Sequence, residues 1–332
     1  MTEHTTRTAP PPALPTLAEI EAAAAVVYRH FSPTPQQEWP LLNERLGTRV
    51  WVKHDNHTPV GAFKIRGGLT YFDALRASGA LPTEVVSATR GNHGQSIGWA
   101  ARHHGVRCTV FVPHGNSREK NAAMRALGVE LIEAGDDFQA SREQALAWAA
   151  ERGAHMVPSF HRDLVRGVST AWWELMTAVP DLDVVYVPIG LGSGACAALA
   201  ARAALQRTRL RVVGVVSAHA TTYAQSIAAG AVVAAPVTTQ LADGMACRVA
   251  DANALPLLAQ GLDDLVQVTD DEVAHAMRCL YSDTHNVAEG AGAASLAGAL
   301  QQADRMRGLR VGVALCGSNV DREVFARVLQ GR

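Results

Sequence analysis

The stretch that decides the fold is Val184-Val185-Tyr186-Val187-Pro188-Ile189-Gly190-Leu191-Gly192-Ser193-Gly194, which an alanine-rich segment follows at Ala195–Ala204. The run Val184–Ile189 is nearly continuous in apolar residues, which is typical of a strand buried on both faces of a sheet. The glycines after it let backbone N–H groups converge at the start of the next helix, where an anion is favoured. The stretch therefore predicts a strand, an anion-binding turn and a helix, although a plain tight turn would have the same pattern.

The same alternation of strand and helix continues along the chain. Asn116–Leu127 predicts one of the helices, with Asn116 as a candidate cap and Glu119 three positions on. Alternating units of this kind imply an α/β fold with parallel twisted sheets that helices cover on both sides. The predicted strands are Val50–Lys53, Val85–Ala88, Cys108–Val112, Glu130–Ile132, His155–Val157, Val184–Val187, Val212–Val216 and Val311–Leu315.

Length and composition predict a globular protein of two domains. The chain has 332 residues, of which 48% are hydrophobic and 18% charged, and a net charge of −1 gives no sign of nucleic-acid or anionic membrane binding. No apolar run reaches the roughly 18 residues that span a bilayer. We expect a small domain at 84–160, a large domain formed by 16–83 plus 161–332, and a flexible tail at 1–15, which is polar and rich in proline.

The cysteine pattern bears on metal sites and on the compartment. Five cysteines are scattered along the chain with no C-x-x-C pair, so neither a disulfide framework nor a zinc site is supported. This usage predicts a reducing cytoplasm.

A dinucleotide site is the main alternative for the glycine-rich turn. Such a site requires an acidic residue about 20 positions on, at the end of the next strand. That strand ends in Val215-Val216-Ser217, which has no carboxylate. The pattern therefore favours a simpler phosphate, and a nicotinamide dehydrogenase remains a distant hypothesis.

Three short motifs carry reactive or polar side chains. Lys64 stands within Phe63–Gly68, where it is either an imine-forming amine, which needs a lowered pKa and a dry setting, or a surface lysine at a helix start. Asn92 follows a predicted strand and either binds a ligand oxygen or forms an Asn-Gly turn. Cys316 ends another strand and is either a buried structural cysteine or a neutral thiol that faces a heteroatom of a ligand.

Taken together, the motifs resemble those of the fold-type II pyridoxal-phosphate enzymes, in the serine/threonine dehydratase and serine racemase branch. The resemblance extends from about Phe31 to Val328. It implies a two-domain fold like that of the tryptophan synthase β subunit, a homodimer, and pyridoxal 5'-phosphate as cofactor. The motifs that carry it are Phe63-Lys64-Ile65-Arg66-Gly67, Gly91-Asn92-His93-Gly94, Gly190 to Gly194, Ala242-Asp243-Gly244, Ala288-Glu289-Gly290-Ala291-Gly292 and Cys316 to Asn319.

The resemblance also implies a role for each motif. Lys64 would hold the cofactor as a Schiff base and then act as base at the substrate Cα, with Phe63 packed beside the ring. Asn92 would hydrogen-bond the 3-oxygen of the ring, and Cys316, where many relatives carry serine, would face the ring nitrogen. Backbone N–H groups of Gly190, Leu191, Gly192, Ser193 and Gly194 would bind the phosphate. The substrate would contact Thr89, Arg90, Gly91, Asn92 and His93.

A thiol at Cys316 predicts the type of reaction. Its reference pKa is about 8.5 and it is a weak donor, so it cannot hold a full proton on the ring nitrogen as an aspartate does. Loss of a β-leaving group then fits better than transamination. The resemblance implies a carbon–oxygen lyase, an ammonia-lyase that converts a β-hydroxy-α-amino acid, threonine or serine by default, to a 2-keto acid and ammonia.

Two departures from the family pattern qualify this expectation. Arg90 stands where relatives usually have serine or alanine, and because its pKa exceeds about 12 it cannot act as a racemase acid. It motivates an alternative substrate with a bulkier or acidic β-substituent, such as phenylserine or 3-hydroxyaspartate. Val216 and Thr222 stand where metal-binding relatives carry carboxylates, so no metal is expected. A non-catalytic amino-acid or cofactor-binding module is a further alternative, which the intact Lys64 disfavours.

Overall fold

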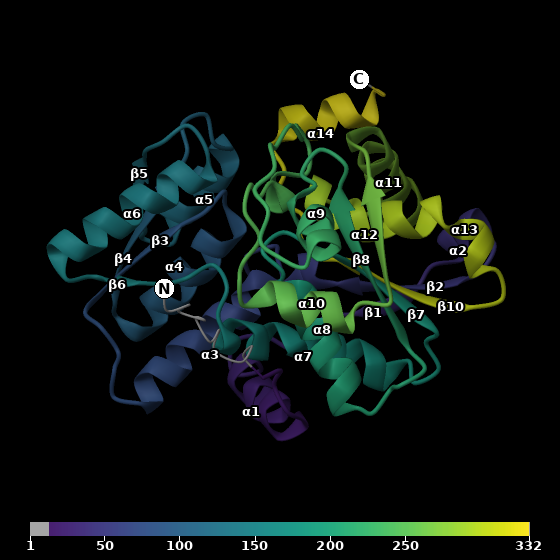
Figure 1. Cartoon of the computed structure of the whole chain (residues 1–332), viewed down its shortest axis with the longest axis horizontal. Coiled ribbons are helices and arrows are strands. Elements are labelled where there is room, and N and C mark those ends of the chain that lie inside the picture. The colour runs from purple at the N-terminus through teal and green to yellow at the C-terminus, as the bar shows by residue number, and fades with distance from the viewer. Residues whose placement is uncertain (1–12, 332) are drawn as a thin grey trace, which may run out of the picture.

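In the computed structural model, which describes residues 13–331, a six-stranded sheet forms the centre of the larger of two units (Figure 1). All of its strands are parallel except β1, which pairs antiparallel with β2. Because β2, β10 and β7 are neighbours, segments from the start, end and middle of the chain leave the sheet at one edge. In spatial order the strands are β1 (Gln36–Glu38), β2 (Arg49–His54), β10 (Arg310–Leu315), β7 (Val184–Pro188), β8 (Arg211–Ser217) and β9 (Asp264–Val268).

The smaller unit is built on a second sheet of four parallel strands. All four strands fall within the stretch 84–160 that was expected to form a small domain, whose boundaries stay a prediction. In spatial order they are β5 (Glu130–Glu133), β4 (Arg107–Val112), β3 (Glu84–Ala88) and β6 (His155–Met156). The helices of this unit are α4 (Asn92–His104), α5 (Arg118–Ala126) and α6 (Phe138–Arg152).

Helices pack on both faces of the larger sheet, and α3 lies against both α4 and α7 (Figure 1). The helices of the large unit are α1 (Leu17–Val27), α2 (Pro40–Leu46), α3 (Lys64–Ala77), α7 (Arg162–Ala178), α8 (Ser193–Ala204), α9 (Thr222–Ala229), α10 (Ala254–Gly261), α11 (Asp270–Thr284), α12 (Gly290–Gln301), α13 (Ala303–Met306) and α14 (Arg322–Leu329), with short 3-10 turns η1 (Asp55–His57) and η2 (Asp243–Met245).

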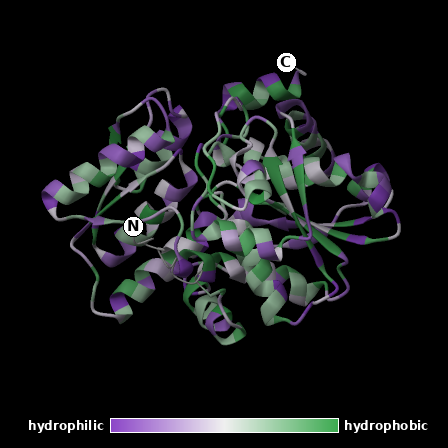
Figure 2. Ribbon diagram, viewed as in Figure 1, coloured by the Kyte–Doolittle hydropathy of each residue, from purple (hydrophilic) through white to green (hydrophobic). Residues whose placement is uncertain are grey.

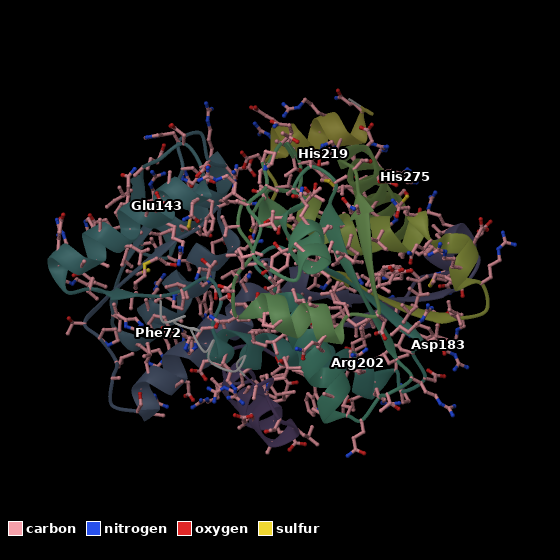
Figure 3. All side chains as sticks on the ribbon, viewed as in Figure 1. Phe72, Glu143, Asp183, Arg202, His219 and His275 are labelled. Carbon is pink, nitrogen blue, oxygen red and sulfur yellow. The ribbon has the colours of Figure 1, made fainter. Side chains whose placement is uncertain are left out.

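The core lies on both sides of the larger sheet, because alternate residues of a strand face opposite ways. On β7, Val184 and Tyr186 belong to the cluster that includes α11 and α12, whereas Val185 and Val187 belong to the cluster that includes α7 and α8. Figure 2 shows hydrophobic residues along the central strands and hydrophilic ones mostly on outer helix faces. Figure 3 shows the side chains, among them that of the exposed Glu143 on α6.

The structure confirms the α/β fold with parallel sheets, and each of the eight predicted strands is present. The strands β1 and β9 were missed, because both are edge strands with polar residues that give no continuous apolar run. The cap of α5 was also wrong. Ser117, not Asn116, accepts the hydrogen bond from the Lys120 backbone N–H at 3.1 Å, and the Asn116 side chain instead bonds Asn121.

Part of the expected tail, residues 1–12, lies outside the described residues. Within residues 13–15, the backbone oxygen of Ala13 accepts a 2.9 Å hydrogen bond from Arg162, and Leu14 packs against the core. Over residues 13–331, no helix combines the length and the apolar character that crossing a bilayer demands.

Candidate active site

The segments before Lys64 and after Cys316 are joined to each other at the edge of the larger sheet. The backbone N–H of Phe63 donates to the Cys316 oxygen at 2.9 Å, and the N–H of Ser318 donates to the Gly61 oxygen at 2.9 Å. They leave the adjacent strands β2 and β10. Two motifs about 250 positions apart in sequence therefore lie side by side at this edge of the sheet.

Lys64 is the first residue of α3, and its amine reaches across to the first residue of α8. Nζ donates a 2.9 Å hydrogen bond to Ser193 Oγ. Burial lowers the pKa of the Lys64 amine from its usual range. The chain has only three lysines, and the other two, Lys53 and Lys120, are ion-paired to Glu174 and Glu289. Lys64 is thus the lysine suited to act as a neutral nucleophile or base.

A buried ionic network holds the start of α3 in place. Arg66 is fully buried and lies 2.9 Å from Asp55 and 2.6 Å from Glu174, and Lys53 lies 2.5 Å from Glu174. Because charges in the interior must be paired, this network restricts the position of the helix that carries Lys64.

The glycine-rich turn leaves the N-terminus of α8 free for an anion. The helix has no side-chain cap, and Gly192 before it has φ +96°. The turn is supported from outside, because Tyr223 Oη donates to the Leu191 oxygen at 2.9 Å. Uncapped N–H groups at a helix start favour a phosphate or carboxylate.

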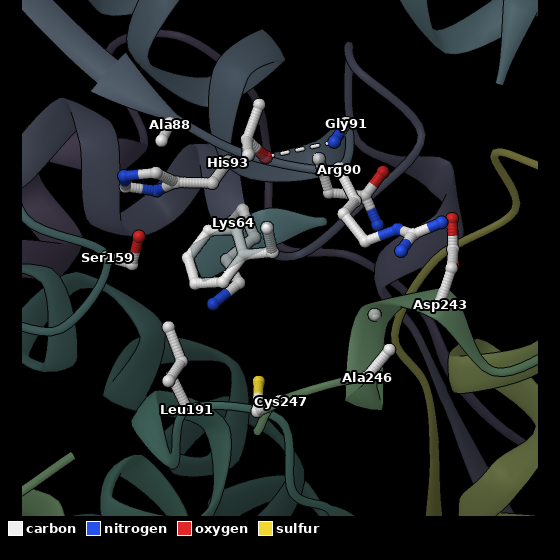
Figure 4. A pocket seen from close by; sticks show the side chains of 14 residues that line it. Lys64, Ala88, Arg90, Gly91, His93, Ser159, Leu191, Asp243, Ala246 and Cys247 are labelled. Atoms are coloured by element: carbon white, nitrogen blue, oxygen red, sulfur yellow. Dashed lines mark hydrogen bonds between the residues drawn. The ribbon is translucent and has the colours of Figure 1, made fainter. Parts of the chain in front are cut away.

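A second uncapped helix N-terminus, that of α4, lies at a cavity that Leu191 of the glycine-rich turn also lines. Gly91, with φ +151°, precedes the helix, and its N–H donates to Thr89 Oγ at 2.9 Å. The hydroxyl of Thr89 therefore holds its own loop. The cavity is about 90 Å³, and its lining includes Lys64, Leu191, Cys247 and all five residues 89–93 predicted to bind the substrate (Figure 4).

Arg90 and His93 line this cavity with nitrogen atoms that have no partner among residues 13–331. Arg90 Nε and His93 Nε2 are both buried in this way. Burial, with the nearby Lys64, lowers the pKa of His93 to about 3, so the ring is neutral. Of these two side chains only the guanidinium of Arg90 offers a charge to an additional anion, and the Asp243 carboxylate lines the same cavity.

Asn92 lines the cavity described above, whereas Cys316 lines a second cavity together with Phe63 and Gly194. The Asn92 amide donates to Glu289, and Asn319 donates to Asn92 Oδ1 at 2.8 Å. Cys316 is buried, with Sγ 3.6 Å from the Ala291 oxygen. Burial raises the pKa of its thiol well above the usual range, so the thiol is neutral.

Four residues in or beside the cavity had no predicted role, and of these only Asp243 and Cys247 line it. Lys120, Asp243 and Glu289 form an ion-paired cluster, although Asp243 and Glu289 stood within quoted motifs. Cys247 faces the cavity, and burial raises its pKa to about 12. The sequence did contain a signal for Glu289, because it stands between small apolar residues in Ala288-Glu289-Gly290. Burying an unpaired carboxylate there would cost free energy, which indicates that Glu289 has a partner.

The arrangement fits pyridoxal 5'-phosphate. The uncapped α8 suits its phosphate, and the lowered pKa of Lys64 suits attack on its aldehyde. Asn92 Nδ2 has a second proton to donate to a ring oxygen, and the neutral Cys316 can approach the ring nitrogen without opposing charge.

Comparisons with known proteins agree with this geometry. The family model described as pyridoxal-phosphate dependent enzyme matches residues 27–317. The L-threonine ammonia-lyase of Geobacter sulfurreducens is 33% identical over 290 residues, which cover 87% of this chain and 72% of that protein. The L-threo-3-hydroxyaspartate ammonia-lyase of Saccharomyces cerevisiae is 29% identical over 96% of this chain and 98% of its own length. A crystal structure of a threonine deaminase from T.th. has a TM-score of 0.85 and 29% identity, over 92% of this chain and 99% of that one.

Proposed function

The chain belongs to the pyridoxal-phosphate-dependent enzymes, and we propose that it is an ammonia-lyase that converts a β-hydroxy-α-amino acid to a 2-keto acid and ammonia. The observation that carries the proposal is the Lys64 amine, which has a lowered pKa, lines the cavity and is hydrogen-bonded to Ser193 at the head of the uncapped α8. The default substrates are threonine and serine.

Two uncapped helix starts give the site two places for anions. We assign the turn before α8 to the cofactor phosphate and the turn before α4 to the substrate α-carboxylate. When bound, pyridoxal phosphate supplies an electron sink for the bond that breaks at Cα. Lys64 Nζ, with its lowered pKa, takes the Cα proton, and Ser193 Oγ orients it.

The remaining site residues direct the outcome. With the cofactor bound, Asn92 Nδ2 would donate its second proton to the ring oxygen, and Phe63 would pack beside the ring. The neutral Cys316 thiol supplies no full charge at the ring nitrogen, so we expect elimination of the β-hydroxyl to outrun transamination. His93, neutral and buried, contacts the substrate without adding charge.

Arg90 favours a second candidate substrate with an acidic β-substituent. Its Nε is buried without a partner in the described residues, and arginine binds carboxylates through paired hydrogen bonds. A relative named for 3-hydroxyaspartate aligns with nearly the whole chain. We therefore hold 3-hydroxyaspartate as the alternative to threonine and serine.

The experiment that tests the proposal is a keto-acid and ammonia assay over threonine, serine, phenylserine and 3-hydroxyaspartate in each configuration. We expect a purified protein with a visible cofactor band that releases a 2-keto acid from at least one of them. Cofactor binding without any turnover would favour the binding-module alternative.

We also propose a homodimer in the cytoplasm. The family resemblance supports the dimer, and five buried cysteines without a disulfide support a reducing compartment. Light scattering on the purified protein tests the first point.

A further inference from the structure

The side-chain amide of Asn92 is held at both ends. Nδ2 donates to Glu289 Oε1, and Oδ1 accepts a 2.8 Å hydrogen bond from Asn319 Nδ2. Asn319 is itself fixed by a 2.9 Å bond to the Val60 oxygen. These bonds decide which end of the amide carries the protons, and they leave one Nδ2 proton free to point at a ring oxygen.

Glu289 is in turn held by Lys120 of the small unit. Lys120 Nζ lies 2.8 Å from Glu289 Oε2 and 2.7 Å from Asp243 Oδ2. The side chains of Lys120 and Glu289 are only 5% and 2% exposed. Burial raises the pKa of Glu289, and the neighbouring Asp243 raises it further, whereas Lys120 opposes both effects. Without this cation a buried carboxylate takes up a proton rather than staying charged.

Lys120 reaches the large unit from α5 by passing over Gly91. A Cβ on Gly91 would overlap the Lys120 side chain, and the left-handed φ of +151° also favours glycine there. The stem of Lys120 therefore lies against the loop that lines the cavity, while its amine meets Glu289 and Asp243. The contact between the two units passes directly through the site.

We propose that Lys120 and Glu289 are positioning residues, whose ion pair fixes the Asn92 amide toward the cofactor. The inference rests on the proposed function, in which Asn92 donates to the 3-oxygen of the ring. Loss of the pair neutralises Glu289, weakens its bond to Asn92 and frees the amide to rotate. A hydrogen bond to a charged group contributes a factor of roughly 10 to 150 in binding.

A second link between the units supplies a matched control, because it does not touch Asn92. Asp321, before α14, accepts hydrogen bonds from Ser117 Oγ and, at 3.2 Å, from the N–H of Glu119 at the start of α5. Glu119 in return accepts from the Arg322 N–H at 2.9 Å. Asp321→Ala therefore loosens α5 from the large unit and leaves the Lys120–Glu289–Asn92 chain of contacts in place.

The experiment compares holoenzymes of the wild type, Lys120→Met, Glu289→Gln and Asp321→Ala. For each protein we would record the visible band of the bound cofactor, the pH midpoint of that band, the cofactor Kd of the apoenzyme, and Tm. We expect Lys120→Met and Glu289→Gln to move the pH midpoint by about one unit, since one unit corresponds to about 1.4 kcal/mol. We expect the cofactor Kd to rise about tenfold or more in both. Asp321→Ala should lower Tm and leave the midpoint unchanged.

Two results would overturn the proposal. One is a fall in Tm for Lys120→Met and Glu289→Gln with no change in the band, because a purely structural pair behaves that way. The other is an equal change of the midpoint in Asp321→Ala. Should Lys120→Met fail to fold, the nearly isosteric Glu289→Gln decides the question. A wild type with no visible band would instead refute the proposed function, which keeps the two failures distinct.

Discussion

Replacing Arg90 with alanine tests whether the substrate carries a second carboxylate. The guanidinium lines the cavity, and its Nε is buried without a partner among residues 13–331. Truncation therefore breaks no hydrogen bond of this nitrogen. We expect the free energy of unfolding to change by no more than about 0.5 kcal/mol, as is usual where no buried contact is broken.

The expected effect on catalysis is much larger. Hydrogen bonds to charged groups contribute about 1.5 to 3 kcal/mol, and a bidentate arginine contact lies toward the upper end. At about 1.4 kcal/mol for each factor of ten, Arg90→Ala should lower kcat/KM for 3-hydroxyaspartate by roughly 10- to 150-fold. Threonine and phenylserine have no second carboxylate, so their losses should be well below this range.

The assay measures keto-acid release over the substrate panel, with two control variants. Arg90→Lys keeps the positive charge but cannot form the paired hydrogen bonds of a guanidinium, so its activity should lie between those of Arg90→Ala and the wild type. Arg102→Ala removes an exposed arginine from α4, the helix that follows the Arg90 loop, away from the cavity, and should change neither kcat/KM nor Tm. Equal and small losses across the panel for Arg90→Ala would refute the reasoning and give Arg90 a structural role.

Lys64→Ala should abolish turnover and the visible band, while the cofactor still binds through the α8 turn. In the wild type, borohydride reduction should attach the cofactor to the peptide that contains Lys64 and to no other. Mass spectrometry can check this directly, because the chain has only three lysines. Wild-type turnover in Lys64→Ala would contradict the proposed function. Cys316→Asp should slow elimination and increase transamination, because a carboxylate at contact distance favours the protonated ring nitrogen; an unaltered rate and spectrum would place Cys316 away from the ring. Chelators should leave activity and Tm nearly unchanged, because Val216 is in the core and the Thr222 hydroxyl donates to the Val233 oxygen. Strong stimulation by magnesium or calcium after chelation would show that ligands come from other residues.

The fold was predictable because its main signals are local. A strand buried on both faces must be apolar along its whole length, as Val184–Ile189 is, and the glycines and alanines after it mark the turn and the helix. The strands β1 and β9 have no such signal, since an edge strand is stabilised by one neighbour and tolerates polar residues. Ser117 caps α5 rather than Asn116 because cap choice depends on backbone angles that adjacent residues do not specify.

For the site, the sequence by itself determined the reactive groups: a lysine after an apolar strand, a glycine turn before a helix, and a thiol at the end of another strand. Only the tertiary structure decided which charged groups pair with each other. Lys120 and Glu289 lie on different units, and each would be costly to bury alone, so their significance appears only when both meet beside Asn92. The physical reason is that the strength of a charge interaction depends on distance and burial, and both arise from packing between segments far apart in the chain.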